Sequence, residues 1–206
     1  MFQDPYPVIE ERPLAAVARR FLRPTRRDLT ELPEARPGTL WVFDAGGHYE
    51  TFDRRYLSGT EPAVVDAVTV SLVDIRPRRV PVEMSIPSAS PADDFVFRVD
   101  FRCVVTGPSV VAAAGLTDLT APLRNYLTRD RKLLVMGMNF KVDDILALRE
   151  EITARVSSYC EVNPPRIDGI KVELGAVTVR TPADLRTQET KIRPESANSG
   201  KTRVVR

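Results

Sequence analysis

Cysteine, histidine and long apolar runs are scarce in this chain, and each shortage excludes some classes of protein. Among its 206 residues are 2 cysteines and 1 histidine. Two cysteines are too few for a disulfide framework or for paired-cysteine zinc motifs, which favours a cytosolic protein. No run of 18 apolar residues occurs, and acidic residues and prolines interrupt the first twenty positions. The sequence therefore predicts neither a membrane-spanning helix nor a signal peptide.

Net charge is also small. The chain has 30 lysines and arginines against 28 acidic residues, a formal charge of +2. Nucleic-acid binding by a whole domain needs a larger basic excess, so we expect no nucleic-acid partner. A hydrophobic fraction of 43% with 28% charged residues is ordinary for a globular domain that buries a core. Any electrostatic partner must therefore be bound by a local cluster of charges.

Such a cluster occurs near the start of the chain. Residues 1–38 are rich in proline and arginine and show little alternation, so we predict an arm outside the folded domain. Within it, residues 13–23 can form a short amphipathic helix that begins at Pro13 and ends before Pro24. At about 1 kcal/mol per basic residue near an anionic leaflet, its arginines could attract a membrane surface. The alternatives are a contact with a neighbouring subunit and a solvated arm. The candidate contact residues are Arg19, Arg20, Phe21, Arg23, Arg26 and Arg27.

From Thr39 onward the patterns of β-strands dominate. Residues 39–52 read as a hairpin around Gly46 and Gly47, residues 63–77 as a strand apolar on both faces, and residues 78–87 as another strand. The clearest period-two pattern lies in residues 94–105, where arginines and an aspartate alternate with apolar side chains. The predicted buried face of this strand consists of Phe95, Phe97, Val99, Phe101, Cys103 and Val105.

After this strand the apolar period changes to that of helices. Asp118 is a plausible N-cap, and residues 141–160 carry an apolar stripe formed by Ile145, Leu148, Ile152, Val156 and Tyr159. Residues 169–182 return to strand. The order predicts an α+β domain over residues 39–181, a mainly antiparallel sheet with helices packed on one face. We expect residues 182–206 to form a short helix and a disordered basic tail.

The order of these elements carries a family resemblance. Five short motifs occur in sequence: Gly107-Pro108 after the alternating strand, Leu123-Arg124, Arg149-Glu150-Glu151-Ile152, Gly169-Ile170-Lys171-Val172 and Pro182-Ala183-Asp184-Leu185. In this order the chain, over residues 64–190, resembles the band-7 domain of stomatins, prohibitins and flotillins. Members usually carry an apolar membrane-inserting segment before the domain and a long coiled coil after it, and the 206 residues contain neither.

The resemblance implies a non-enzymatic scaffold of the band-7 type. Its partners would be copies of itself, arranged in rings or cages, together with an anionic membrane surface and unidentified proteins. We therefore expect a homo-oligomer in the cytoplasm that attaches peripherally at the inner face of the membrane. The alternative is a soluble protein-interaction module of a larger complex, with the flanking arms as docking segments.

No residue pattern predicts an enzyme. The Gly200-Lys201-Thr202 sequence lacks the glycine that a phosphate-binding loop requires five positions earlier, where Glu195 stands. His48, the one histidine, has no nucleophile motif or paired cysteines with it, and a hairpin position explains it better. Asp74 lies in an otherwise apolar strand, as does Asp66, and we expect the arginines at 76, 78 or 79 to supply a structural ion pair. We accordingly assign no catalytic, cofactor-binding or metal-binding residues.

Overall fold

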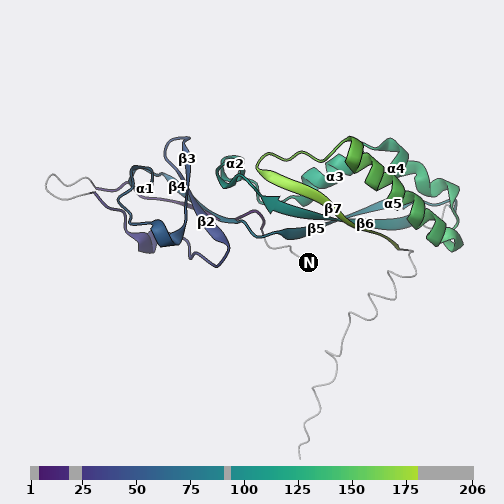
Figure 1. The fold of residues 1–206 in the computed structure, drawn as a ribbon, viewed down its shortest axis with the longest axis horizontal. Helices are drawn as coiled ribbons and strands as arrows, with labels where there is room; N and C mark the ends of the chain where they lie inside the picture. The colour runs from purple at the N-terminus through teal and green to yellow at the C-terminus, as the bar shows by residue number, and fades with distance from the viewer. Residues whose placement is uncertain (1–4, 19–24, 91–93, 181–206) are drawn as a thin grey trace, which may run out of the picture.

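The computed structural model describes residues 5–18, 25–90 and 94–180. It confirms an α+β fold, but the strands divide into two antiparallel sheets instead of one. Sheet A has the strand order β1-β4-β2-β3, and sheet B has the order β5-β6-β7. Figure 1 shows the two sheets following one another along the molecule, with the longer helices beside sheet B.

Sheet A is built from β1 (Val8–Pro13), β2 (Thr39–Asp44), β3 (Tyr49–Phe52) and β4 (Thr69–Asp74). The predicted hairpin is confirmed between β2 and β3, where Gly46 and Gly47 adopt φ of 68° and 92°. The sheet has a small core of its own beside the 3-10 turns η1 (Leu29–Glu31) and η2 (Arg54–Tyr56). This core consists of Leu32, Trp41, Phe43, Val64, Ala67, Val70 and Leu72.

The prediction that residues 1–38 lie outside the fold is wrong for the described part of that segment. β1 pairs with β4 along its length, from Val8 opposite Val73 to Pro13 opposite Thr69. It escaped detection because it is a mainly polar edge strand, and because a register shift between Val8 and Glu10 breaks its alternation. Residues 14–18 are not helical, and residues 19–24 lie outside the described residues.

The strand predicted over residues 63–77 is also shorter than expected. Its first part is instead a helical turn, α1 (Pro62–Val65), because Pro62 at the first helical position favours a helix start. The strand β4 begins only at Thr69. Two valines of the predicted strand therefore belong to a turn that packs on sheet A.

Sheet B consists of β5 (Arg78–Pro87), β6 (Asp94–Val105) and β7 (Ile170–Arg180). All six apolar residues on the predicted buried face of β6 are buried, which confirms that prediction. The opposite face carries charged residues that pair within and across strands. Arg98 lies 2.8 Å from Asp100 of the same strand, and Arg102 lies 2.7 Å from Glu173 of β7. This face of the sheet is open to solvent and carries pairs of oppositely charged side chains.

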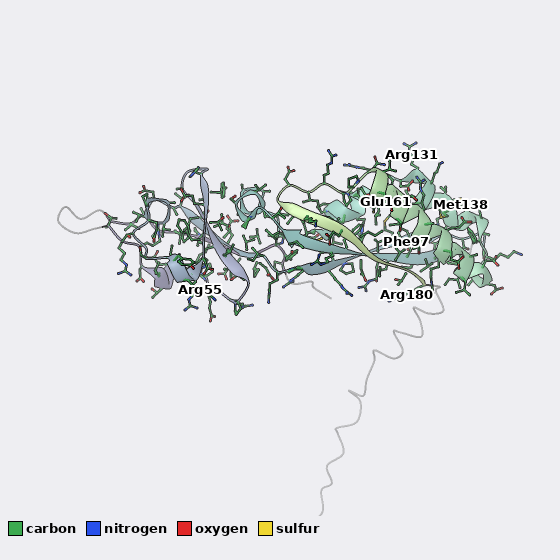
Figure 2. The ribbon with its side chains drawn as sticks, in the orientation of Figure 1. Arg55, Phe97, Arg131, Met138, Glu161 and Arg180 are labelled. Atoms are coloured by element: carbon green, nitrogen blue, oxygen red, sulfur yellow. The ribbon has the colours of Figure 1, made fainter. Side chains whose placement is uncertain are left out.

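Helices cover the apolar face of sheet B, as predicted, and Figure 2 shows Phe97 in the layer between strands and helices. They are α3 (Thr120–Thr128), α4 (Arg131–Val135) and α5 (Ile145–Val162), with the turns η3 (Met136–Asn139) and η4 (Val142–Asp144) between the last two. The short helix α2 (Pro108–Ala113) instead lies beside β2, β3 and β4 of sheet A. The apolar stripe of α5 faces the core, where it buries Leu148, Ile152 and Val156. The N-cap position of α3 is Leu119, one residue after the predicted Asp118, but the carboxylate of Asp118 does accept the backbone N–H of Thr120 in the first turn at 2.8 Å.

Where the two sheets meet, Asp74 forms the predicted structural ion pair. Its buried carboxylate accepts hydrogen bonds from Arg76 at 2.7 and 2.8 Å and lies 3.3 Å from Arg78. Burial raises the pKa of Asp74, but the bonds from Arg76 outweigh it and hold the pKa below its usual range. The hydroxyl of Tyr6 lies 3.2 Å from the carbonyls of both Arg76 and Cys103, and so joins the segment before β1 to sheet B.

Candidate functional site

The predicted contact residue Arg27 is a structural side chain instead. Its guanidinium is fully buried. Its five N–H groups meet five acceptors, which are the carbonyls of Ala15, Val64, Val65 and Ala67 and the carboxylate of Glu31. A side chain used in this way cannot reach a membrane or another subunit. The expectation of a surface contact is therefore wrong for Arg27.

The other members of the arginine cluster divide into two groups. Arg26 is exposed and donates to the carbonyl of Ser58 at 2.9 Å, so it remains on the surface. Arg19, Arg20, Phe21 and Arg23 lie outside the described residues.

His48 occupies the hairpin between β2 and β3, as the sequence indicates. Its Nε2 lies 3.3 Å from Glu50, and the imidazole is exposed. Lys201, like Gly200, lies outside the described residues. In the described part of the chain, no three His, Cys, Asp or Glu side chains come together where they could hold a metal ion. Nor does any helix there have the length and apolar character needed to cross a bilayer.

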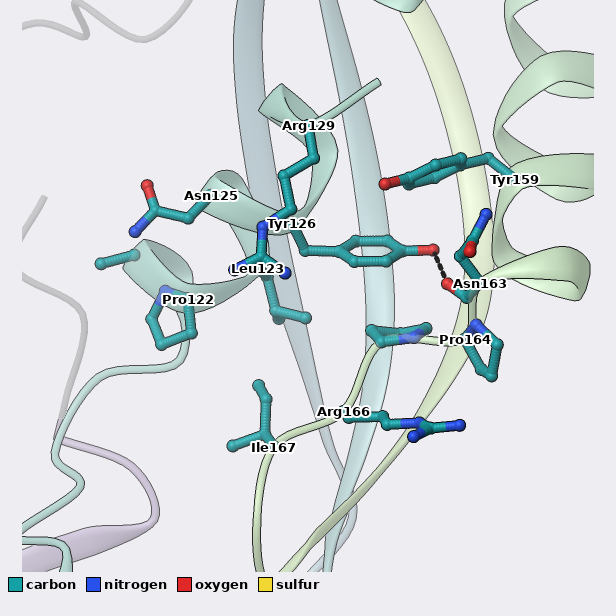
Figure 3. Close-up of a pocket in the computed structure, with 12 residues that line it drawn as sticks. Pro122, Leu123, Asn125, Tyr126, Arg129, Tyr159, Asn163, Pro164, Arg166 and Ile167 are labelled. Carbon is teal, nitrogen blue, oxygen red and sulfur yellow. Dashed lines mark hydrogen bonds between the residues drawn. The ribbon is translucent and has the colours of Figure 1, made fainter. Parts of the chain in front are cut away.

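One surface groove among the described residues lies between α3 and the segment that follows α5. It has a volume of about 700 Å³ and lies beside the helical layer of sheet B. Its lining includes two tyrosines, three prolines and two arginines. Figure 3 shows how Tyr126 and Tyr159 lie in it. The lining residues are Ala121, Pro122, Leu123, Asn125, Tyr126, Arg129, Tyr159, Asn163, Pro164, Pro165, Arg166 and Ile167.

Tyr126 forms the centre of this groove and is rigidly held. Its hydroxyl donates to the carbonyl of Asn163 at 2.7 Å, which joins α3 to the end of α5. The centroid of its ring lies 5.1 Å from that of Tyr159. The ring also packs edge-on against buried Phe101, with a centroid distance of 6.4 Å. Burial raises the pKa of Tyr126 above its usual range, as does its contact with Cys160. The phenol therefore stays neutral. Its ring forms a fixed apolar surface, and its hydroxyl is occupied by the hydrogen bond to Asn163.

Positive charge borders this apolar surface. Arg129 and Arg166 line the groove from opposite segments, and none of the twelve lining residues is acidic. Neither arginine forms an ion pair with any residue that the structure describes. Two guanidinium groups beside tyrosine rings suit a ligand that brings both carboxylates and an apolar side chain.

Sequence reasoning missed this groove because its two sides are more than thirty residues apart. The available signal was the Asn163-Pro164-Pro165 sequence directly after α5, since prolines after a helix end fix a rigid turn. Nothing local indicates that this turn lies against Tyr126.

No family model matches this chain. A search of the curated proteins finds no match either. The likeness to the band-7 domain therefore rests on the order of its sequence motifs, and function has to be argued from the groove and the surfaces around it.

Proposed function

We propose that this chain is a non-enzymatic, self-associating scaffold of the band-7 type, whose contacts between copies build a ring or cage. The groove around Tyr126 is the single observation that carries the proposal. Tyrosine and arginine, with tryptophan, are enriched where protein interfaces gain most of their binding energy. Here both kinds are present on a surface held rigid by the Tyr126–Asn163 hydrogen bond. A rigid platform binds a partner without first losing conformational entropy.

The chemistry of the groove favours binding over catalysis. A side-chain nucleophile is activated by a nearby base, a lowered pKa or a metal, whereas the hydroxyl of Tyr126 donates to a backbone carbonyl and burial raises its pKa. The thiol of Cys160 beside it has its pKa raised by burial, which lowers the thiolate fraction that would react. These features support a role in assembly.

The alternative is an interaction module within a larger complex, in which the groove accepts an acidic segment of another protein. Self-association separates the two, since only the scaffold needs contacts between identical chains.

Peripheral membrane attachment from the cytoplasm is a further part of the proposal. It rests on Arg19, Arg20, Phe21, Arg23 and the exposed Arg26, because many weak basic contacts add up in an oligomer. Vesicles with and without anionic lipid test it. Binding that needs anionic lipid and weakens when Arg19, Arg20 and Arg23 are replaced by Gln is the expected result, and equal binding by the variant contradicts the attachment.

Light scattering after size-exclusion chromatography tests the scaffold itself. We expect a molar mass that is a multiple of one chain and that falls on dilution or at high salt, because exposed charge contacts are screened. A single chain at every concentration would contradict self-association and favour the interaction module.

A further inference from the structure

We infer that copies of this chain meet head to tail, with the start of α5 of one copy seated in the Tyr126 groove of the next. The inference rests on the proposed self-association and identifies the surfaces that carry it. The inserted surface, here called the α5 tip, consists of Asp143, Leu146 and Glu150.

Leu146 is the apolar centre of the α5 tip. It lies in the first turn of α5, where it is 67% exposed. Burying a leucine side chain contributes about 1.5–3 kcal/mol, so an exposed one on a rigid helix is an available anchor. The groove offers the matching floor of tyrosine rings and prolines.

The charges of the two surfaces are complementary. Glu150 follows Leu146 by one helical turn and so shares its face, while Asp143 precedes it in η4. Residues 143–151 contain four carboxylates and one arginine, Arg149, which gives a net charge of −3. The groove lining contains two arginines and no acidic residue, a net charge of +2. Such a pairing favours association and fixes the orientation of the partner.

The α5 tip cannot occupy the groove of its own chain. The groove uses Tyr159 and the residues just after α5, whereas Leu146 lies in its first turn. Leu146 and Tyr159 lie 13 residues apart in this helix, which at a rise of about 1.5 Å per residue separates them by roughly 20 Å. Figure 1 shows α5 running across the helical layer of sheet B. A contact between two different surfaces of identical chains is heterologous, so it repeats and closes into a ring or continues as a filament.

Charge reversal tests this contact in the full chain. One double variant carries Arg129→Glu and Arg166→Glu in the groove, and the other carries Asp143→Lys and Glu150→Lys on the α5 tip. Each variant alone should raise the concentration at which half the chains are associated by at least about tenfold, because like charges then face each other. An equimolar mixture should associate as the parent does, since each mutated surface meets a complementary one on the other variant.

A matched control reverses charges elsewhere. Arg54→Glu with Arg55→Glu gives the same change in net charge beside sheet A, and Figure 2 places Arg55 far from the helical end marked by Met138. This control should associate as the parent does. A chain that carries the groove reversals and the α5-tip reversals together should also associate, because its two surfaces are again complementary. This result would show that each variant alone lost the contact and not its fold.

Parent-like association of the groove variant would overturn the head-to-tail contact while leaving self-association established, and the groove would then serve another protein. Dissociation of both variants without recovery in the mixture would likewise overturn it. A parent that is monomeric at every concentration would instead refute the proposed function from which the inference starts.

Discussion

Replacement of Arg27 by lysine separates a structural arginine from a surface charge. Arg27→Lys keeps the positive charge, so a side chain that served only to attract an anionic surface would tolerate the change. The structure predicts a loss of stability instead. Five donors of the guanidinium satisfy five acceptors around α1, and an ammonium group has only three.

The magnitude follows from this difference. With three donors for five acceptors, at least two acceptors lose their partners. One of them can be the half-exposed carboxylate of Glu31, which water can satisfy, so at least one buried or part-buried carbonyl is left without a donor. Each unsatisfied buried group costs about 1–3 kcal/mol, so the free energy of unfolding should fall by at least about 1–3 kcal/mol. For a chain of this length that corresponds to a decrease in the midpoint of thermal unfolding of at least roughly 2 °C.

Thermal unfolding followed by circular dichroism measures this loss, and Arg26→Lys is the matched control. Arg26 is the neighbouring exposed arginine, so its replacement should change the free energy of unfolding by no more than about 0.5 kcal/mol. If Arg27→Lys were as stable as Arg26→Lys, the buried guanidinium would not stabilise the fold and the reasoning would be refuted.

Three further substitutions test the core, the ion pairs and the junction of the sheets. Phe101→Ala should cost about 3–5 kcal/mol in chemical denaturation, because it leaves a cavity where β6 packs under the helices; a change below about 1 kcal/mol would refute that packing. Asp130→Asn should cost about 1–3 kcal/mol at neutral pH, since Arg155 holds the carboxylate at 2.6 and 2.7 Å and lowers its pKa. Because the folded pKa lies below the unfolded value of about 3.9, the carboxylate's contribution is complete above that pH and is lost as the pH falls through the folded pKa. The difference between parent and variant should therefore shrink in acid, and a constant difference would exclude this ion pair as its cause. Tyr6→Phe should cost about 0.5–1.5 kcal/mol, because it removes the one O–H donor that two carbonyls share, and equal thermal stability of variant and parent would show that this donor contributes nothing.

Sheet B and its helices were predictable because their signals are local and strong. The alternation in β6 and the stripe of α5 each place large apolar side chains at a fixed period, and burial follows the pattern at Phe97 and Leu148 alike. The ion pair of Asp74 was predictable for a similar reason. A carboxylate in an apolar strand has to find a donor, and the nearest arginines follow it in sequence.

The structure of the first forty residues and the groove could not be predicted, because both depend on contacts between residues distant in sequence. In the sequence Arg27 cannot be told from a surface arginine. Its partners include the carbonyls of α1, which lies nearly forty residues later in the chain. β1 has a single fully buried side chain, Val8, so its strand character comes from pairing with β4. The groove likewise exists only after Tyr126 and Asn163 have been brought together.

The molar mass of the full chain at sedimentation equilibrium, measured over a wide range of concentration, tests the proposed scaffold most directly. We expect a concentration-dependent mass above that of one chain, which the groove variant Arg129→Glu with Arg166→Glu reduces toward the monomer. The mass of a single chain across the whole range would contradict self-association.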